Sequence, residues 1–229
     1  MEFALVGWQE DEPTLKLDYR RFSYAGKFVM STTGKAVIRR SDDRSGGDSA
    51  DDDPAGDAPI SCDGAVDASR ASAVPDPAEF DDGVLAAAAF NEDRTDPGVL
   101  WLRYVTVRAD RRGEGLGARL AAFVADRAAE RGYRRLRIAV NNPFSYQALY
   151  KAGFAYTGRR TGLAELVLER PGERDRPTYQ CGFDVFRDRD LGGVERDFLD
   201  AKEGADPPDL VEVPDGGNAN AARRPDSGA

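Results

Sequence analysis

Apolar runs of strand length occupy the middle of the chain. Val84–Phe90 and Val99–Val107 are β-type runs joined by Asn91–Gly98, a loop rich in Asp, Pro and Gly. Each run ends where polar and turn-forming residues begin, so each predicts one strand of a sheet. Further strands of the same kind are predicted at Leu136–Val140, Phe154–Thr157 and Ala164–Leu168.

Helical periodicity separates these strands. Apolar residues recur at the spacing of one helix face, and the helix they predict ends near Gly132; the residues are Leu116, Leu120, Phe123 and Val124. Two shorter helices are predicted, one beginning at Asn141-Asn142-Pro143 and ending at Lys151, the other at Gly193–Lys202.

The N-terminal part is predicted to contribute strands. Lys27–Arg40 has the pattern of a hairpin, with Phe28-Val29-Met30 and Ala36-Val37-Ile38 on either side of a Ser-Thr-Thr-Gly turn. Phe3–Tyr24 also favours strands, because apolar positions alternate at Leu15, Leu17 and Tyr19. Since the strands cluster in antiparallel pairs around one strand–helix–strand crossover, the pattern predicts an α+β fold, a mixed α/β sandwich, rather than a doubly wound one.

Charge divides the chain into unlike segments. Residues 41–83 carry 13 acids and 2 bases with little apolar content, which predicts an acidic low-complexity insertion. It interrupts a main domain at residues 1–170, whose core is 84–170. Residues 171–206 are predicted to be an extension that either packs on the core or forms a small appendage, and 207–229 are predicted to be a disordered tail. By contrast, residues 99–170 carry 14 bases and 6 acids, so the core suits an anionic ligand.

Composition excludes several chemistries. The chain has no histidine and only two cysteines, which rules out Ser-His-Asp and Cys-His nucleophile systems and a four-ligand Cys/His zinc site. We therefore expect no metal. Any proton transfer must use a carboxylate, Tyr, Lys, Cys or water.

The kind of charged residue suggests where the protein works. Of 41 acids 28 are Asp, and of 32 bases 27 are Arg, which predicts a salt-adapted cytoplasmic protein; GC-rich codon usage is the alternative explanation. The N-terminus has no basic leader, and no apolar run is long enough to span a membrane. Two cysteines far apart in sequence, Cys62 and Cys181, favour free thiols in a reducing compartment.

The most informative motif is Arg112-Gly113-Glu114-Gly115-Leu116-Gly117, which leaves the predicted strand at Val107 and opens the long helix. Alternate glycines and free first-turn N–H groups suit a phosphate. One interpretation is a dinucleotide site, because Gly113-x-Gly115-x-x-Ala118 satisfies a loose G-x-G-x-x-A. Five residues separate Val107 from Gly113, however, and no acid follows the next strand. A second interpretation is a helix entry that binds nothing.

A set of motifs favours a different interpretation. Val105-x-Val107, then Arg112-x-x-Gly115-x-Gly117, then Asn142, then Leu149-Tyr150-Lys151-Ala152-Gly153-Phe154 resembles the GCN5-related N-acetyltransferase (GNAT) family. The resemblance covers roughly residues 84–170. It implies the acyl-CoA N-acyltransferase fold: a central, twisted, mostly antiparallel sheet with one splayed strand pair and flanking helices.

The resemblance also assigns cofactor-binding residues. The backbone N–H groups of the loop would hold the pyrophosphate of coenzyme A; these residues are Arg112, Gly113, Glu114, Gly115, Leu116 and Gly117. The pantetheine arm would hydrogen-bond to the main chain at Val105 and Val107, and to Asn142 on its other side. Asn142 lies eight residues before Tyr150, where the family usually has seven, and helix capping before Pro143 is the alternative role of this asparagine.

Catalytic roles are less well marked. By resemblance, Tyr150 would protonate the departing thiolate, with packing of its ring into the sheet as the alternative. No carboxylate lies in Val99–Val107, so Glu92 or Asp93 would act on the amine through water, or positioning alone would suffice. A backbone N–H around Val105 would hold the oxyanion.

The expected activity is acetyl-CoA-dependent transfer of an acetyl group to a primary amine by direct attack. Alternatives are a non-catalytic acyl-CoA-binding or sensing domain and a dinucleotide-binding oxidoreductase. Expected partners are acetyl-CoA and an amine, on a small molecule or a protein, without nucleic acid or membrane; the protein would be a monomer or homodimer. The family's usual two helices between the first two strands are not visible in the sequence, so the acceptor wall is expected to be unusual.

Overall fold

A computed structural model describes residues 1–41 and 80–213. Its strands form a seven-stranded sheet in the order β1-β2-β3-β4-β5-β7-β6. Of the strand pairs described, only β4–β5 is parallel. The strands are β1 (Glu2–Gly7), β2 (Gly34–Arg39), β3 (Val84–Glu92), β4 (Val99–Val107), β5 (Arg135–Val140), β6 (Ala155–Arg160) and β7 (Leu166–Arg170). The predicted fold class, a mixed α+β sandwich with a mostly antiparallel sheet and flanking helices, is confirmed.

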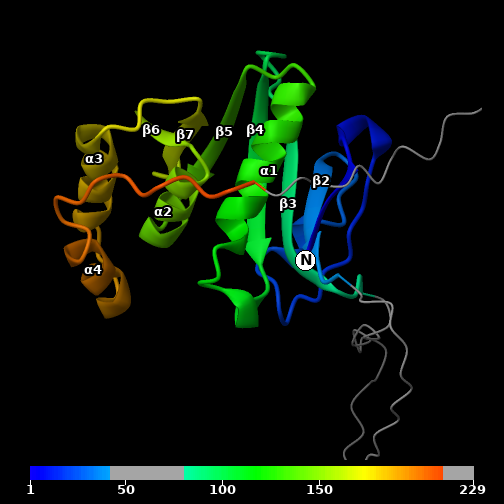
Figure 1. Ribbon diagram of the computed structural model, residues 1–229, viewed down its shortest axis with the longest axis horizontal. Coiled ribbons are helices and arrows are strands. Elements are labelled where there is room, and N and C mark those ends of the chain that lie inside the picture. Colours follow the sequence, from blue (N-terminus) through cyan, green and yellow to red (C-terminus); the bar gives the residue numbers. More distant parts are fainter. Residues whose placement is uncertain (42–79, 214–229) are drawn as a thin grey trace, which may run out of the picture.

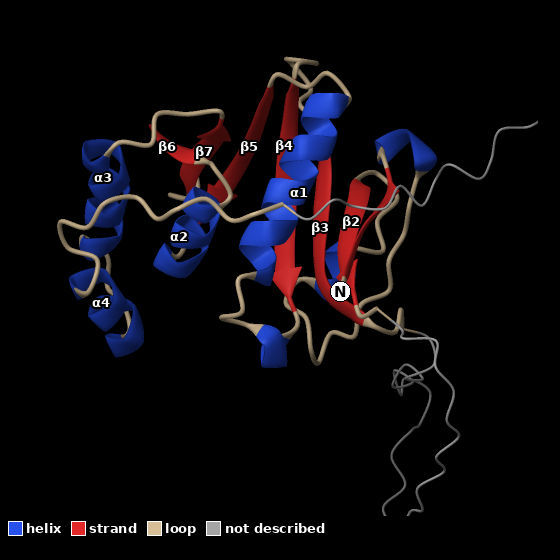
Figure 2. Ribbon diagram, in the orientation of Figure 1, coloured by secondary structure: helices blue, strands red, loops and turns tan. Residues whose placement is uncertain are grey.

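Helices cover one face of this sheet (Figures 1 and 2). They are α1 (Leu116–Glu130), α2 (Pro143–Lys151), α3 (Arg176–Arg187) and α4 (Gly193–Asp200). The buried side of α1 packs on alternate residues of the strands, because strand side chains point to opposite faces in turn. This larger core contains, among others, Leu120, Phe123, Leu102, Ile138 and Leu168.

The other face of the first strands is covered by an irregular segment. Leu15, Leu17, Phe22 and Phe28 are buried there in a second core, which also includes Val37, Ala87 and Ala89. Two short 3-10 turns lie in this part of the chain, η1 (Gln9–Asp11) and η2 (Ala25–Lys27). The prediction of strands over Phe3–Tyr24 is therefore correct only for β1; the alternating residues Leu15 and Leu17 belong to a loop and are buried from it.

The predicted hairpin at 27–40 is wrong in its first half. Residues 28–30 form no strand, and β2 instead pairs with β1 and β3. The buried amine of Lys35 helps to shape this turn, because its Nζ donates to the carbonyls of Met30 and Thr33 at 2.8 and 2.7 Å. The apolar residues Phe28-Val29-Met30 therefore lie in a loop that the Lys35 amine stabilises, and they do not pair as a strand.

The C-terminal extension adds α3 and α4 to the outer side of α2 (Figure 1). Three aromatic residues of α3 recur at helical spacing and are fully buried: Tyr179, Phe183 and Phe186. They pack around Tyr146 of α2, with ring centroids 5.0 to 5.9 Å away. A Cβ on Gly182 would collide with the Tyr146 ring, so a glycine is required for this close approach. The sequence analysis predicted α4 and missed α3.

Residues beyond α4 continue along the core as far as 213. The Val211 N–H donates to the Lys151 carbonyl at 2.9 Å, and Arg174 donates to the carbonyls of Tyr150 and Pro208. The remaining part of the predicted tail, and most of the predicted acidic insertion, lie outside the described residues.

Candidate functional site

The most distinctive feature of the sheet is the separation of β4 from β5. Their parallel ladder runs from Val99–Arg135 to Leu102–Ile138 and stops there. At the same point the register of β4 against β3 shifts, leaving Arg103 as a bulged residue. Bulges bend a strand and re-aim its backbone. The second half of β4 therefore keeps one partner, β3, and exposes its other edge to a gap.

Backbone direction identifies which groups border this gap. The Arg108 N–H donates to the Leu85 carbonyl at 2.9 Å and so points toward β3. Because backbone groups alternate along a strand, the N–H and C=O of Val107 and Val105 point away from β3, into the gap. These are the main-chain groups that the sequence analysis assigned to the pantetheine arm.

The glycine loop lies at the end of the same gap. Gly113 and Gly115 have φ of 89° and 78°, in the left-handed region that favours glycine. Gly115 is the N-cap of α1 and supplies no side chain to its first-turn N–H groups, which have no intrahelical partner. A Cβ on Gly117 would lie 3.4 Å from Val107 Cγ2, an ordinary van der Waals contact, so Gly117 packs against the end of β4. The loop thus has the backbone geometry of an anion cradle.

Ion pairs hold the surroundings of the cradle in place. Arg111 donates two hydrogen bonds to Glu114, at 2.6 and 2.7 Å, and this contact holds the pKa of Glu114 below its usual range. Arg108 pairs with Asp110 at 2.7 Å. Arg112 instead donates to the Ser23 hydroxyl at 2.9 Å, so its positive charge is not matched by a carboxylate among the described residues.

Asn142 lies at the same end of the sheet as the glycine loop, because it follows β5 and β5 is parallel to β4. It is the N-cap of α2, and its Oδ1 accepts from the Ser145 N–H at 2.8 Å. Its Nδ2 donates to Asn141 Oδ1 at 3.3 Å. In this conformation the side chain performs the capping role that the sequence analysis kept as an alternative.

Tyr150 lies elsewhere. Its side chain is fully buried, and its hydroxyl accepts from the Tyr156 N–H of β6 at 3.0 Å and lies 3.3 Å from the Tyr146 hydroxyl. Burial raises the pKa of Tyr150. Since β6 is two strands beyond β5, this hydroxyl sits about 10 Å past β5, away from the gap. The structure does not bring Tyr150 together with the glycine loop.

Glu92 is also distant from the loop. It pairs with Leu100 at the start of β4, seven residues from Val107, which is about 23 Å along the strand. There it is exposed and lines a pocket of about 280 Å³ with Trp8, Phe90 and Tyr133; its Oε2 accepts from the Tyr133 hydroxyl at 3.3 Å. Neighbouring Asp93 is committed to Thr95, Trp101 and Asp96, and these hydrogen bonds lower its pKa.

Sequence reasoning missed Arg103. This exposed arginine occupies the bulge where β4 and β5 part, and its Nε donates to Asn91 Oδ1 at 2.6 Å. The signal was present in the sequence, since one arginine interrupts an otherwise apolar and aromatic strand. Its meaning depends on the bulge, which no sequence pattern marks.

The described residues contain no group of three or more His, Cys, Asp and Glu side chains placed to hold a metal ion. No helix in the same residues is long and apolar enough to cross a membrane. The gap suits a different type of ligand. The open edge of β4 offers donors and acceptors in a line, and the cradle at its end offers N–H groups to a phosphate. A dinucleotide fold would require a largely parallel sheet, whereas the sheet in residues 1–41 and 80–213 has one parallel strand pair.

A model of the acetyltransferase (GNAT) family matches residues 41–154. No curated protein matches the chain.

Several solved structures resemble part of the chain. A GCN5-related N-acetyltransferase from Kribbella flavida is 27% identical over 39% of this chain and 61% of that one, with a TM-score of 0.34. An N-acetyltransferase from Staphylococcus aureus Mu50 is 24% identical over 39% and 62%, with a TM-score of 0.35. An acetyltransferase from Bacillus subtilis, in complex with CoA, is 15% identical over 38% and 69%, with a TM-score of 0.34. The match thus spans about three fifths of the length of the first two.

Proposed function

The chain belongs to the GNAT acetyltransferase family, and from this premise we propose that it is an acetyl-CoA-dependent N-acetyltransferase acting on a primary amine. The observation that carries the proposal is the open edge of β4, which runs from the glycine loop to the bulge at Arg103. Val107 lies four positions after Arg103, so this edge offers about 13 Å of unpaired backbone. The two amides of the pantetheine arm would hydrogen-bond to these donors and acceptors, as an additional β-strand would.

The cradle would hold the pyrophosphate. Free N–H groups at the start of α1 and the helix dipole both favour negative charge there. Arg112, whose charge no described carboxylate matches, adds to the attraction. With the pyrophosphate fixed at Gly113–Gly117 and the arm laid along β4, the thioester would end near Arg103 and Tyr104.

Main-chain groups would stabilise the reaction. The amine nitrogen attacks the thioester carbonyl carbon, and the carbonyl oxygen gains negative charge in the tetrahedral intermediate. The N–H of Val105 points into the gap and is the proposed oxyanion donor. The intermediate then expels the thiolate, which takes up a proton, while the attacking nitrogen loses one.

Proton carriers are part of the proposal. We propose that water carries the proton to the thiolate, because the Tyr150 hydroxyl is buried beside β6. Tyr150 remains the alternative acid, and the variant that lacks its hydroxyl, Tyr150→Phe, tests this role. Glu92 is the candidate base, acting through water from the start of β4. Positioning of the amine against the thioester would supply much of the rate.

A second candidate is a domain that binds acyl-CoA without catalysis. Two observations favour it: the buried Tyr150 hydroxyl and the lack of a carboxylate on β4. Both candidates share the cradle and the open edge of β4, so only turnover separates them. For either one we propose a salt-adapted cytoplasmic protein, monomeric or homodimeric.

Calorimetric titration in high salt with acetyl-CoA, CoA and NADH tests both candidates. We expect binding of the two CoA species and none of NADH. Release of free CoA thiol with a panel of primary amines then measures turnover. Failure to bind either CoA species would overturn both candidates; binding without thiol release above the hydrolysis background would leave only the acyl-CoA-binding domain.

A further inference from the structure

Beside the gap, the two faces of the sheet differ sharply. On the α1 face, β4 and β5 present fully buried side chains, including Leu102, Leu136 and Ile138. On the opposite face they present Trp101, Arg103 and Tyr104 of β4 and Arg137 and Ala139 of β5, all exposed or half-buried. A second substrate can therefore reach the gap only from this opposite face.

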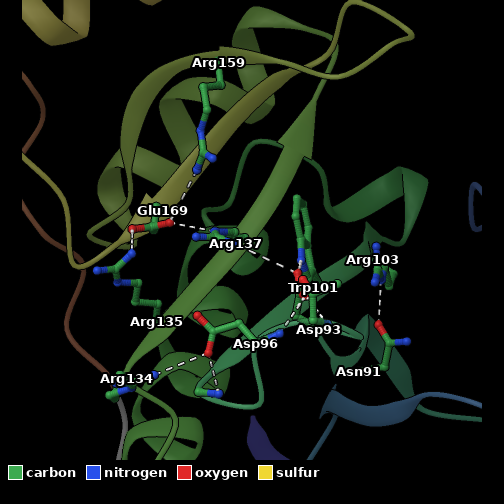
Figure 3. Close-up of polar contacts among 12 residues, drawn as sticks. Asn91, Asp93, Asp96, Trp101, Arg103, Arg134, Arg135, Arg137, Arg159 and Glu169 are labelled. Atoms are coloured by element: carbon green, nitrogen blue, oxygen red, sulfur yellow. Dashed lines mark hydrogen bonds and ion pairs between the residues drawn. The ribbon is translucent and has the colours of Figure 1, made fainter.

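Arginine dominates the open face (Figure 3). Three of its arginines converge on one carboxylate, Glu169 of β7. Arg137 Nε lies 2.7 Å from Glu169, while Arg135 and Arg159 lie at 3.6 and 3.9 Å. Arg137 also lies 4.0 Å from Asp93. These arginines are held by acidic partners that the chain itself provides.

Arg103 differs from them. Within residues 1–41 and 80–213 it makes no ion pair, and its only hydrogen bond runs from Nε to the amide oxygen of Asn91. Its Cζ lies 5.1 Å from the centroid of the Trp101 ring, so the guanidinium is stacked as well as anchored. Figure 3 shows the side chain beside Trp101 with Asn91 beyond it. The Nε anchor leaves the two Nη groups as donors toward solvent.

The Arg103 guanidinium is preorganised to bind one planar oxyanion. Anchoring by Asn91 and Trp101 reduces the entropy lost when a ligand binds. The fork of N–H donors matches a carboxylate in two parallel hydrogen bonds. Its position matters equally, since Arg103 is the first residue after the β4–β5 ladder ends, where the thioester would lie.

We propose that Arg103 binds a carboxylate of the acceptor, so that the substrate class is a small primary amine that carries a carboxylate, such as an amino acid. This inference rests on the proposed acetyltransferase function. The amine would lie in the gap near Tyr104, and the carboxylate would lie over the open face toward Trp101. A polyamine or a lysine-rich peptide would meet the positive charge of Arg103 there and would bind poorly.

Paired acceptors test the substrate class directly. Each pair consists of an amino acid and the amine that lacks only its carboxylate: β-alanine with ethylamine, and L-phenylalanine with 2-phenylethylamine. O-phosphoethanolamine replaces the carboxylate by a phosphate, and spermidine serves as the polycation. We expect kcat/KM, measured by thiol release, to be at least tenfold higher for the carboxylate member of a pair. Equal or reversed preference within the pairs would overturn the proposal, as would preference for spermidine or for O-phosphoethanolamine.

Variants locate the preference at Arg103. Arg103→Gln should raise KM for the preferred amino acid ten- to a hundredfold and bring the ratio within a pair close to one. Arg103→Lys keeps the charge without the fork and should give an intermediate KM. Asn91→Ala frees the guanidinium and should raise the same KM severalfold. Arg196→Gln, at an exposed arginine of α4 remote from the gap, is the matched control.

The outcomes separate this inference from the proposed function. If acetyl-CoA binds and amines are acetylated but Arg103→Gln leaves the pair ratio unchanged, the carboxylate contact is wrong and the acetyltransferase stands. If no acceptor of any charge is acetylated, the proposed function fails and this inference fails with it. Thermal unfolding of each variant checks that a changed KM does not reflect loss of fold.

Discussion

Two motifs of similar clarity in the sequence have different surroundings in the structure. The glycine loop, Arg112–Gly117, lies at the open end of the gap, and its first-turn N–H groups lack intrahelical partners. Leu149–Phe154 ends α2 inside the core, and Tyr150 and Phe154 are fully buried. The first motif presents unused hydrogen-bond donors, whereas the polar group of the second is already engaged.

The difference shows which structural properties can be predicted from the spacing of a motif. Spacing fixes local backbone geometry at Gly113 and Gly115, because positive φ is a property of the residues themselves. The surroundings of Tyr150 depend on α3, which comes from a later part of the chain and covers α2 with its own aromatic rings. A binding loop can therefore be identified locally, but the accessibility of a hydroxyl cannot.

The largest expected difference between the two motifs is in their response to alkaline pH. Burial raises the pKa of Tyr146, Tyr150 and Tyr179, the last to about 12. Because the folded pKa exceeds the unfolded value of about 10, the stabilisation is complete below pH 10 and is lost as pH rises toward the folded values. At about pH 11 the ionisation of Tyr179 alone should lower the unfolding free energy by about 1.4 kcal/mol, and Tyr146 and Tyr150 should lower it further.

Urea unfolding at about pH 9 and about pH 11 measures this loss, and Tyr146→Phe should make the loss smaller. The backbone donors of the glycine loop do not titrate in this window. Acetyl-CoA affinity of the molecules that remain folded should therefore change little. Unchanged stability at the higher pH would mean that the tyrosines are not buried as described.

Gly115→Val tests the other motif. A β-branched residue strains the backbone at φ 78° and displaces the first-turn N–H groups from the phosphate position. We expect acetyl-CoA affinity to fall about a hundredfold, or about 2.7 kcal/mol. Calorimetric titration measures it, with Gly162→Val as control, since Gly162 is exposed and does not have a positive φ. Equal affinity in the two variants would mean that the loop does not hold the ligand.

The sequence predicted the elements whose pattern is local. The strands β3, β4 and β5 and the helices α1 and α2 follow from apolar runs and helical spacing in short windows. The start of the sheet was misjudged because β2 pairs with Glu2–Gly7, a contact far along the chain. Helix α3 was missed although Tyr179, Phe183 and Phe186 recur at helical spacing after an Asp175 cap, a signal that could have found it. The bulge at Arg103 had no signal in the pattern.

Tyr150→Phe asks whether the buried motif also has a chemical role. Loss of the hydroxyl leaves the Tyr156 N–H without its partner, which should cost about 1–3 kcal/mol of unfolding free energy. Since the hydroxyl lies away from the gap, we expect kcat to change by less than about threefold, well below the 10²–10⁴ of general acid catalysis. Steady-state kinetics below the unfolding temperature decide it: a hundredfold fall in kcat would establish Tyr150 as the acid.

Asn142→Ala should give the smallest effect, and it allows the N-caps of α2 and α3 to be compared directly. Asn142 caps α2 as Asp175 caps α3: each accepts from a backbone N–H at 2.8 Å, and each is followed by a proline in the first turn. Asn142→Ala and Asp175→Ala should therefore each cost about 1 kcal/mol of unfolding free energy. Only Asn142 lies at the gap, so only its variant should also weaken acetyl-CoA binding, by about three- to tenfold if its amide turns to the pantetheine arm. Equal affinity in both variants would restrict Asn142 to capping and leave the pantetheine contacts to Val105 and Val107, because capping alone gives no reason for a difference between the two helices.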